Sequence, residues 1–287
     1  MNRLALGTVQ FGQDYGVANR SGQVSFDQIK ESLHIAALHG VNTLDTAITY
    51  GNSESLIGQI GVEKFRVITK LPEIPRGVDV QEWIKSQVMT SLGRLNTSSV
   101  YGLLLHRPQQ FHGSLGLEVL AALKTLKEKG VINKIGISIY NPEDLDDLPL
   151  EHIEIVQAPY NIMDLRLFTS GIAKKLKDLG IELHTRSVFL QGLLLMPAKD
   201  RPAKFQRWDD LWSKWDAWLR DHGISAKQAC LGFVLSQKEI DRVIVGFDSS
   251  LQLKELLEIA SKESFNDWPI FEGCDLNLLN PSRWSAL

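Results

Sequence analysis

Short apolar runs alternate with amphipathic segments along the whole chain. Nearly every position within the runs is apolar, whereas a strand with one solvated face would alternate apolar and polar residues. This pattern is typical of strands that are covered on both faces, as in a parallel sheet. The runs predict eight strands, at residues 3–8, 41–45, 65–70, 100–105, 133–138, 153–157, 181–187 and 242–246.

The segments between these strands show the helical period of about 3.6 residues. Glycine adopts the left-handed conformation that commonly ends a helix. We therefore expect three helices to stop at a glycine just before the next strand. These are residues 27–39 before Gly40, 117–129 before Gly130, and 168–179 before Gly180.

Strands that alternate with crossover helices over roughly 250 residues predict an α/β fold, the (β/α)8 TIM barrel. A doubly wound open sheet is the main alternative, but it usually carries a G-x-G-x-x-G turn after its first strand. This chain has GTVQFG there, and it contains no G-x-x-x-x-G-K-[ST] or G-x-S-x-G motif. We predict one barrel domain, residues 1–287, with a C-terminal tail from about residue 263 that packs on the barrel or over its mouth.

Residues 191–208 form the longest segment without a clear period. Long loops in compact domains are usually functional. In the next segment, 209–222, Trp215 and Trp218 stand three residues apart, and Trp212 precedes them. We interpret this segment as a helix that packs its aromatic side chains inward. An aromatic lid over a ligand is the alternative.

The net charge of -3 gives no global attraction for nucleic acid or an anionic membrane. No apolar stretch approaches the roughly 18 residues of a spanning helix, and the start, MNRLALGTVQ, has no signal-peptide core. Cys230 and Cys274 are predicted to be reduced thiols, and no residues have metal-ligand spacing. We expect a soluble cytoplasmic protein without metal, either a monomer or a weak homo-oligomer.

Four polar residues stand at or just beyond the ends of three consecutive predicted strands. Asp45 ends the second strand in "LDTAITYG", Tyr50 follows it, Lys70 ends the third, and His106 follows the fourth. Each residue alone is as readily a cap, a rim residue or a solvated side chain. Active sites of (β/α)8 barrels lie at the C-terminal ends of the strands, so we expect the four side chains to converge at the barrel mouth.

These residue types together predict a proton-donating relay. The pKa of tyrosine is about 10, so Tyr50 is a useful proton donor near neutral pH only if its anion is stabilised. The ammonium of Lys70 would favour the phenolate, and Asp45 would keep that ammonium protonated. His106 would donate a hydrogen bond to a substrate carbonyl or orient it. The relay suits carbonyl reduction by a hydride that arrives from elsewhere.

The same motifs resemble the aldo-keto reductase family, whose members are (β/α)8 barrels that reduce aldehydes and ketones to alcohols with NAD(P)H. The resemblance covers roughly residues 4–256 and implies that Tyr50 donates the proton, Lys70 lowers its pKa, Asp45 pairs with Lys70, and His106 orients the carbonyl. The similar blocks, in the family's order, are "LDTAITYGNSE" (44–54), "VITK" (67–70), "YGLLLHRP" (101–108), "KIGIS" (134–138), "VQAPYN" (156–161), "QGLL" (191–194) and "VGFDSSLQLKE" (245–255).

The resemblance also implies a nicotinamide site at the barrel mouth. Strand ends would hold the carboxamide and the ring, the backbone after strand seven would line the pyrophosphate, and the segment from Gly246 would hold the adenosine end. Ser249 and Ser250 are as readily ordinary helix N-caps. The expected contacts are Gly7, Thr8, Asp45, Ser138, Gln157, Arg186, Ser187, Gln191, Gly192, Leu193, Gly246, Asp248, Ser249, Ser250, Gln252 and Glu255.

Three positions depart from the family pattern. Ile139 stands where many members have Asn, Arg186 where an aromatic residue commonly stacks on the nicotinamide, and Val188 where the usual residue is Pro. Because a guanidinium is planar, Arg186 could stack in place of the aromatic ring. Alternatively, Arg186 binds an anionic substrate or is simply ion-paired.

The cofactor preference is a fourth departure. Members that prefer NADPH place Lys or Arg beside the 2′-phosphate, but residues 246–253 contain no basic residue, and Lys254 is the nearest cation. Asp248 is unfavourable beside a phosphate, whereas an acid can accept a hydrogen bond from a ribose 2′-OH. We expect NADPH, because members of the family that this chain resembles generally use it, with NADH as the alternative.

The polar loop of residues 10–19, with Asn52 nearby, predicts a polar, hydroxylated or charged carbonyl substrate. Two other functions stay open. The barrel could bind cofactor as a sensor or interaction subunit with little turnover. It could also be a Schiff-base lyase that uses a neutral Lys70, although a paired Asp45 would oppose that chemistry.

Overall fold

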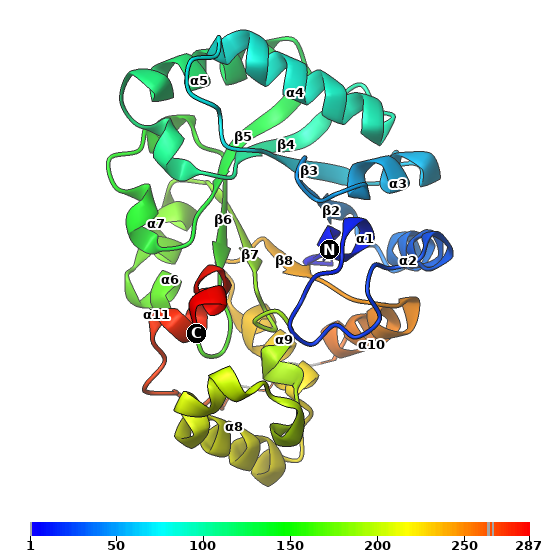
Figure 1. Ribbon diagram of the computed structural model, residues 1–287, viewed down its shortest axis with the longest axis vertical. Coiled ribbons are helices and arrows are strands. Elements are labelled where there is room, and N and C mark those ends of the chain that lie inside the picture. The colour runs from blue at the N-terminus through cyan, green and yellow to red at the C-terminus, as the bar shows by residue number, and fades with distance from the viewer. Residues whose placement is uncertain (1, 263–264, 266) are drawn as a thin grey trace.

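The chain folds into a closed barrel of eight parallel strands with helices around the outside (Figure 1). The computed structural model describes residues 2–262, 265 and 267–287. All eight predicted strands are present, and the (β/α)8 prediction is confirmed. The strands are β1 Leu4–Gly7, β2 Thr43–Asp45, β3 Arg66–Leu71, β4 Val100–Leu105, β5 Ile132–Ser138, β6 Ile155–Pro159, β7 Glu182–Arg186 and β8 Arg242–Val245.

Each strand pairs with its neighbour in the sequence, and β1 closes the barrel on β8. In this closing register Leu4 lies beside Val243 and Leu6 beside Val245. Because every strand runs in the same direction, all eight C-terminal ends meet at one face. That face is the mouth of the barrel, and it carries the predicted polar residues.

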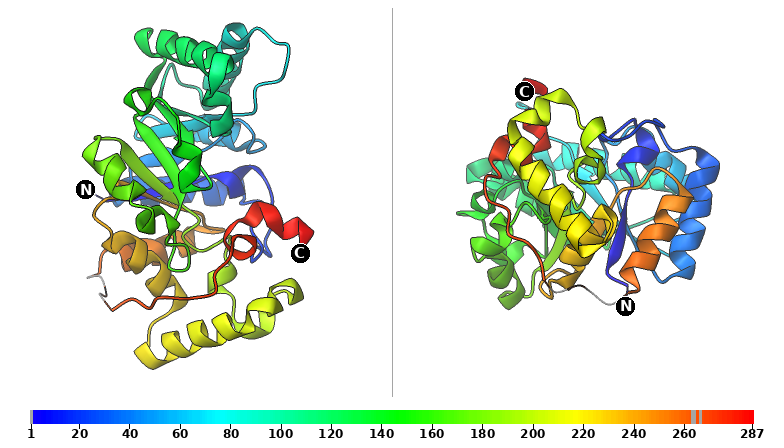
Figure 2. Two further views of the ribbon diagram at one scale, coloured as in Figure 1. Left: turned by 90° about the vertical axis from the view of Figure 1, so that its left-hand side faces the viewer. Right: turned by 90° about the horizontal axis from the view of Figure 1, so that it is seen from below.

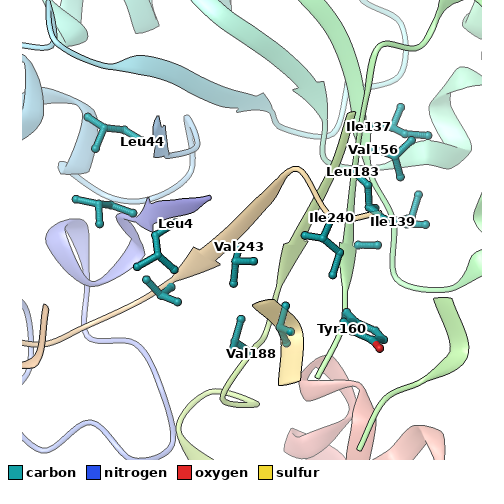
Figure 3. Close-up of a cluster of buried hydrophobic side chains, with 14 of the residues drawn as sticks. Leu4, Leu44, Ile137, Ile139, Val156, Tyr160, Leu183, Val188, Ile240 and Val243 are labelled. Carbon is teal, nitrogen blue, oxygen red and sulfur yellow. The ribbon is translucent and has the colours of Figure 1, made fainter. Parts of the chain in front are cut away.

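The hydrophobic core has two parts of unequal size. The larger part lies between strands and helices, and Figure 3 shows members of it from several strands, among them Leu4, Leu44 and Val243. The smaller part contains Ile68, Leu104 and Ile155. Apolar side chains from β3, β4 and β6 thus form a second cluster, separate from the larger part of the core.

Three predicted helices end at the expected glycines. Gly40, Gly130 and Gly180 have φ of 72°, 70° and 71°, the left-handed conformation that stops a helix. The helix predicted at 168–179 is broken in two, however, because Gly171 also has a positive φ of 78°. The α-helices are α1 Val9–Gly12, α2 Phe26–Leu38, α3 Ser53–Ile60, α4 Val80–Leu95, α5 Gly113–Glu128, α6 Arg166–Thr169, α7 Ile172–Asp178, α8 Asp209–His222, α9 Ala226–Ser236, α10 Ser250–Ala260 and α11 Leu276–Leu279.

The segment predicted as a long loop consists largely of short 3-10 helices. They are η4 Leu193–Leu195, η5 Ala198–Asp200 and η6 Ala203–Trp208. Elsewhere the 3-10 helices are η1 Pro108–Phe111, η2 Pro142–Leu145, η3 Leu150–His152 and η7 Pro281–Ala286. Among the described residues, no helix has the length and apolar character needed to cross a bilayer.

The tryptophans of α8 pack inward, as the first interpretation predicted. Trp212 and Trp215 are buried, and Trp218 stacks on Trp215 with ring centroids 6.1 Å apart. None of the three side chains is among the residues that line the cavity at the barrel mouth. The alternative of an aromatic lid over a ligand is therefore wrong.

The C-terminal segment passes beside α8, as both views in Figure 2 show (red beside yellow). Phe271 contacts Trp215, with ring centroids 5.7 Å apart. The ring of Trp284 meets that of Phe205 edge to face, 4.8 Å between centroids, and Lys204 donates to the Trp284 carbonyl. Of the tail predicted from about 263, residues 263, 264 and 266 lie outside the described residues.

Candidate active site

Asp45 and Lys70 form a buried ion pair where the neighbouring strands β2 and β3 end. Lys70 Nζ donates to Asp45 Oδ2 at 2.7 Å and to the Thr46 carbonyl at 2.9 Å. The Lys70 side chain is 0% exposed and that of Asp45 is 6% exposed. Burial lowers the pKa of Lys70, although the charge of Asp45 opposes this effect. The predicted pairing of these two residues is confirmed.

Two glycines position Tyr50, which lies in the loop after β2. A Cβ added to Gly12 would lie 1.7 Å from the Tyr50 carbonyl oxygen, and one added to Gly51 would lie 2.2 Å from the Gly12 carbonyl oxygen. Only glycine permits this close approach of two backbones. The contact between α1 and the loop holds the Tyr50 ring near the ion pair, with Lys70 Nζ 5.1 Å from the ring centroid.

His106 follows β4 and lies next to Tyr50, with the ring centroids 6.3 Å apart and the rings at 71°. Its backbone N–H donates to the Leu71 carbonyl at the end of β3. Burial, followed by the positive charges of Lys70 and Arg186, lowers the pKa of His106 to about 3. The imidazole is therefore neutral at pH 7, with one nitrogen that donates and one that accepts.

The pKa of Tyr50 is raised rather than lowered. Burial contributes most, the charge of Asp45 adds to it, and Arg186 opposes both. The lowering of this pKa that we expected from Lys70 is not seen in this structure, because burial of the phenol has the largest effect and raises the pKa. Tyr50 is consequently held as the protonated phenol, the form that donates a proton.

Ser138 and Gln157, the two residues expected to contact a carboxamide, form a hydrogen-bonded chain to Asp45. Gln157 Nε2 donates to Asp45 Oδ1 at 2.6 Å, and Ser138 Oγ donates to Gln157 Oε1 at 3.4 Å. Both residues are buried. Each carboxylate oxygen of Asp45 thus has its own partner, Lys70 on Oδ2 and Gln157 on Oδ1, which fixes the orientation of the carboxylate.

A cavity of about 500 Å³ opens at the barrel mouth. Asp45, Tyr50 and His106 line it, and Lys70 is buried next to it. The cavity extends from these residues to the start of α10. It gathers ten of the predicted cofactor contacts: Gly7, Thr8, Asp45, Arg186, Ser187, Gln191, Gly192, Gly246, Asp248 and Gln252.

Four further predicted contacts are not among the residues that line the cavity. Ser249 caps α10 by accepting from the Gln252 N–H, so it takes the N-cap role that the sequence left open. Ser250 Oγ donates to Glu31 at 2.8 Å, and Leu193 is fully buried at the start of η4. Glu255 forms an ion pair with Lys227.

The lining of this cavity suits a nicotinamide cofactor, because glycine backbone and hydroxyl and amide side chains border it. A Cβ at Gly246 would come within 2.5 Å of the Gln10 amide, and one at Gly7 would lie 3.1 Å from Ile244. A side chain at either position would meet these protein atoms, so glycine lets the backbone pack closely against its neighbours at the cavity wall. The loop after β7 also turns sharply, since Ser187 and Gln191 have φ of 63° and 53°. Backbone in this sparsely populated conformation is often found at ligand sites.

Tyr140 and Lys227 are two of the cavity residues that were not identified from the sequence. Tyr140 lies two positions beyond β5, and its ring faces the Arg186 guanidinium at 4.6 Å. An aromatic residue just past a strand end was the available signal. Lys227 lines the other end of the cavity from the first turn of α9. No sequence pattern indicated Lys227, because only the fold brings α9 to the mouth.

The structure shows the surroundings of Ile139, Arg186 and Val188, the three residues that depart from the family pattern. Ile139 is buried, but its carbonyl accepts a hydrogen bond from Arg186 Nη2 at 3.0 Å. Within the described part of the chain, Arg186 forms no ion pair with a carboxylate, and its polar contacts are the Ile139 carbonyl and the Ser187 hydroxyl. The ion-paired alternative for Arg186 is therefore wrong. Val188 is buried and contributes to the cavity lining.

Charged groups at the α10 end bear on the cofactor preference. Asp248 lines the cavity, and burial raises its pKa. Lys254, the nearest cation in the sequence, is turned to Glu31 and is not among the lining residues. Lys227 does line the cavity, but it is paired with Glu255. Among the described residues, the cations at this end are thus already matched by carboxylates.

The sequence matches the model of the aldo/keto reductase family over residues 3–270. Protein tas from Escherichia coli is 25% identical over 93% of this chain and 92% of its own length. L-galactose dehydrogenase from Arabidopsis thaliana is 28% identical over 82% of this chain and 78% of its own. The fold resembles the holo form of aldo-keto reductase AKR11C1 from Bacillus halodurans, with a TM-score of 0.72, 20% identity and 94% of both chains covered. The chain therefore belongs to the aldo/keto reductase family and is an NAD(P)-dependent oxidoreductase that acts on carbonyl and alcohol groups.

Proposed function

We propose that the protein reduces an aldehyde or ketone to an alcohol, or catalyses the reverse reaction, with Tyr50 as the proton donor. The observation that carries this proposal is the arrangement at the strand ends: Tyr50 and His106 line one cavity beside the buried pair of Asp45 and Lys70. When bound, the nicotinamide supplies the hydride. The residues of this chain then bind the carbonyl oxygen and supply its proton.

The protonation states support these roles. Tyr50 is protonated, so it can donate to an oxygen that gains negative charge. His106 is a neutral imidazole and can donate its N–H to the same oxygen. The ammonium of Lys70 lies near the phenol ring and favours the phenolate that forms as the proton leaves. Asp45 keeps that ammonium charged and in position.

The cofactor would lie along the rest of the cavity. Gly7 and Thr8 would contact the nicotinamide end, the turn from Ser187 to Gly192 the pyrophosphate, and the start of α10 the adenosine end. We propose NADPH, because members of the family generally use it. Lys227 is the lining cation that could contact its 2′-phosphate. Asp248 favours the alternative, NADH. The ratio of dissociation constants for the two cofactors, followed by tryptophan fluorescence, decides between them.

The Schiff-base alternative lacks support from the geometry. A Schiff base requires a neutral amine that the substrate can reach. Lys70 is 0% exposed and is hydrogen-bonded to Asp45 and Thr46. A sensor with little turnover would share the same cofactor site and differ only in rate. Measured turnover with a carbonyl substrate separates these two.

Substitution of Tyr50→Phe tests the proposal. It removes the phenol hydroxyl but keeps the ring and its contacts, so kcat should fall by orders of magnitude while cofactor affinity stays near that of the wild type. Steady-state kinetics and a cofactor titration measure both quantities. Turnover retained in the phenylalanine variant would reject Tyr50 as the donor. If the wild-type protein binds neither NADPH nor NADH, the whole proposal is rejected.

A further inference from the structure

The catalytic end of the cavity carries one positive charge with no counter-charge among the described residues. Asp45 neutralises Lys70, and the lowered pKa of His106 leaves its ring uncharged. Arg186, at the end of β7, lines the same cavity. Its recorded partners, a carbonyl and a hydroxyl, are both neutral.

The guanidinium of Arg186 is held in a defined orientation. Its Cζ atom lies over the Tyr140 ring, 4.6 Å from the ring centroid. Nη2 donates to the Ile139 carbonyl at 3.0 Å, and Nη1 donates to the Ser187 hydroxyl at 3.3 Å. A guanidinium has about five N–H groups, so these contacts leave further donors for a ligand. Their forked geometry matches the two oxygens of an oxyanion group.

Arg186 lines the same cavity as Tyr50, the proposed proton donor, and His106. Its charge opposes the rise in the pKa of Tyr50 and contributes to the lowered pKa of His106. One molecule could therefore place a carbonyl at Tyr50 and His106 and an anionic group at Arg186. The opposite end of the cavity differs in charge, because Asp248 lines it there. This polarity favours an anionic group beside Arg186.

We propose that Arg186 binds a carboxylate on the substrate, so that the protein acts on aldehydes or ketones that also carry a carboxylic acid. A carboxylate fits better than a phosphate, because one guanidinium balances one negative charge, whereas a phosphate monoester carries about -1.5 to -2 at pH 7. The inference rests on the proposed function of the site and adds the class of its substrate. A phosphate of the cofactor is the other possible source of an oxyanion.

A matched pair of substrates tests the proposal. 4-Oxobutanoate and its methyl ester share the aldehyde and differ in the carboxylate charge. The ratio of kcat/KM for the acid to that for the ester should fall about tenfold or more in Arg186→Gln, since the lost bond is charge-assisted. Arg186→Lys should recover part of the ratio because it keeps the charge. Arg107→Gln removes a charge next to His106 but does not line the cavity, so it should leave the ratio near that of the wild type.

A binding measurement separates this proposal from the proposed function. Calorimetric titration with succinate, which has no carbonyl to reduce, should show binding to the wild type and a loss of affinity of about tenfold or more in Arg186→Gln. If the enzyme turns over no carbonyl compound but succinate binds through Arg186, the proposed function fails and the anion site stands.

Two results would overturn the inference. One is an acid-to-ester ratio that Arg186→Gln leaves unchanged. The other is a larger dissociation constant for NADPH and NADH in that variant, with the acid-to-ester ratio of kcat/KM unchanged. That result would assign Arg186 to a cofactor phosphate. Should Arg186→Gln fail to fold, the same measurements on Arg186→Lys decide, because its shorter, single ammonium cannot form a two-pronged contact.

Discussion

Substitution of Asp45→Asn would isolate the role of the buried ion pair. The change keeps the shape of the side chain but removes the negative charge that Lys70 contacts at 2.7 Å. Lys70 is 0% exposed, so water cannot take over the role of the carboxylate. The variant leaves either an unpaired ammonium or a neutral amine in the barrel.

Both outcomes lower the free energy of unfolding, and the two estimates of that loss are similar. Removing one partner of a buried ion pair typically costs about 3–5 kcal/mol. Neutralising a lysine of unfolded pKa about 10.4 at pH 7 costs roughly 4.6 kcal/mol, at 1.36 kcal/mol per pH unit. We therefore expect a loss of about 3–5 kcal/mol in unfolding free energy. At roughly 2 °C per kcal/mol for a chain of this size, Tm should fall by about 6–10 °C.

The pH dependence distinguishes the two outcomes. If Lys70 becomes neutral in the folded variant, its folded pKa is below its unfolded pKa, and the unfolded state binds more protons. Stability of the variant relative to wild type should then rise with pH, by up to about 1.4 kcal/mol per unit, until the pH approaches about 10.4. Urea unfolding between pH 7 and pH 9 measures this slope.

Two variants complete the assay. The double variant Asp45→Asn with Lys70→Met removes both charges and should recover much of the lost stability. Asp178→Asn breaks an exposed pair with Lys174 and should change the unfolding free energy by about 0.5 kcal/mol or less. An Asp45→Asn variant within about 1 kcal/mol of wild type would refute the reasoning, because the pair would then contribute no more than a surface pair.

Two further predictions concern other parts of the fold. Gly12→Ala should lower kcat strongly and destabilise the protein, because the added Cβ would meet the Tyr50 carbonyl at 1.7 Å, whereas Gly93→Ala in α4 meets no atom within 4 Å and should be neutral or stabilising; activity and thermal unfolding of both variants check this. Burial alone would raise the pKa of Glu182, but hydrogen bonds from His184, Lys134 and Tyr101 outweigh it and hold that pKa well below its usual range. Its stabilisation is present above the unfolded pKa of about 4.3 and is lost as pH falls below it, so acid unfolding of Glu182→Gln should show a shallower pH slope than wild type.

Local patterns were sufficient for the barrel and for the ends of its strands. Apolar residues at nearly every strand position required cover on both faces, and a glycine after a helix required a stop. The same information placed Asp45, Tyr50, Lys70 and His106 at one face, because parallel strands all end on the same side. These features depend on contacts between residues close in sequence and on one rule of topology.

Tertiary structure decided what those residues contact. Gln157 holds the second oxygen of Asp45, and the two residues are far apart in sequence. Burial, which no local pattern reports, raises the pKa of Tyr50 against the expected effect of Lys70. Arg186 without a counter-charge and Lys227 at the cavity emerged only once distant loops and helices were placed side by side. Pairing, solvent access and charge balance depend on neighbours that the chain brings together by folding, and the sequence by itself does not say which neighbours these are.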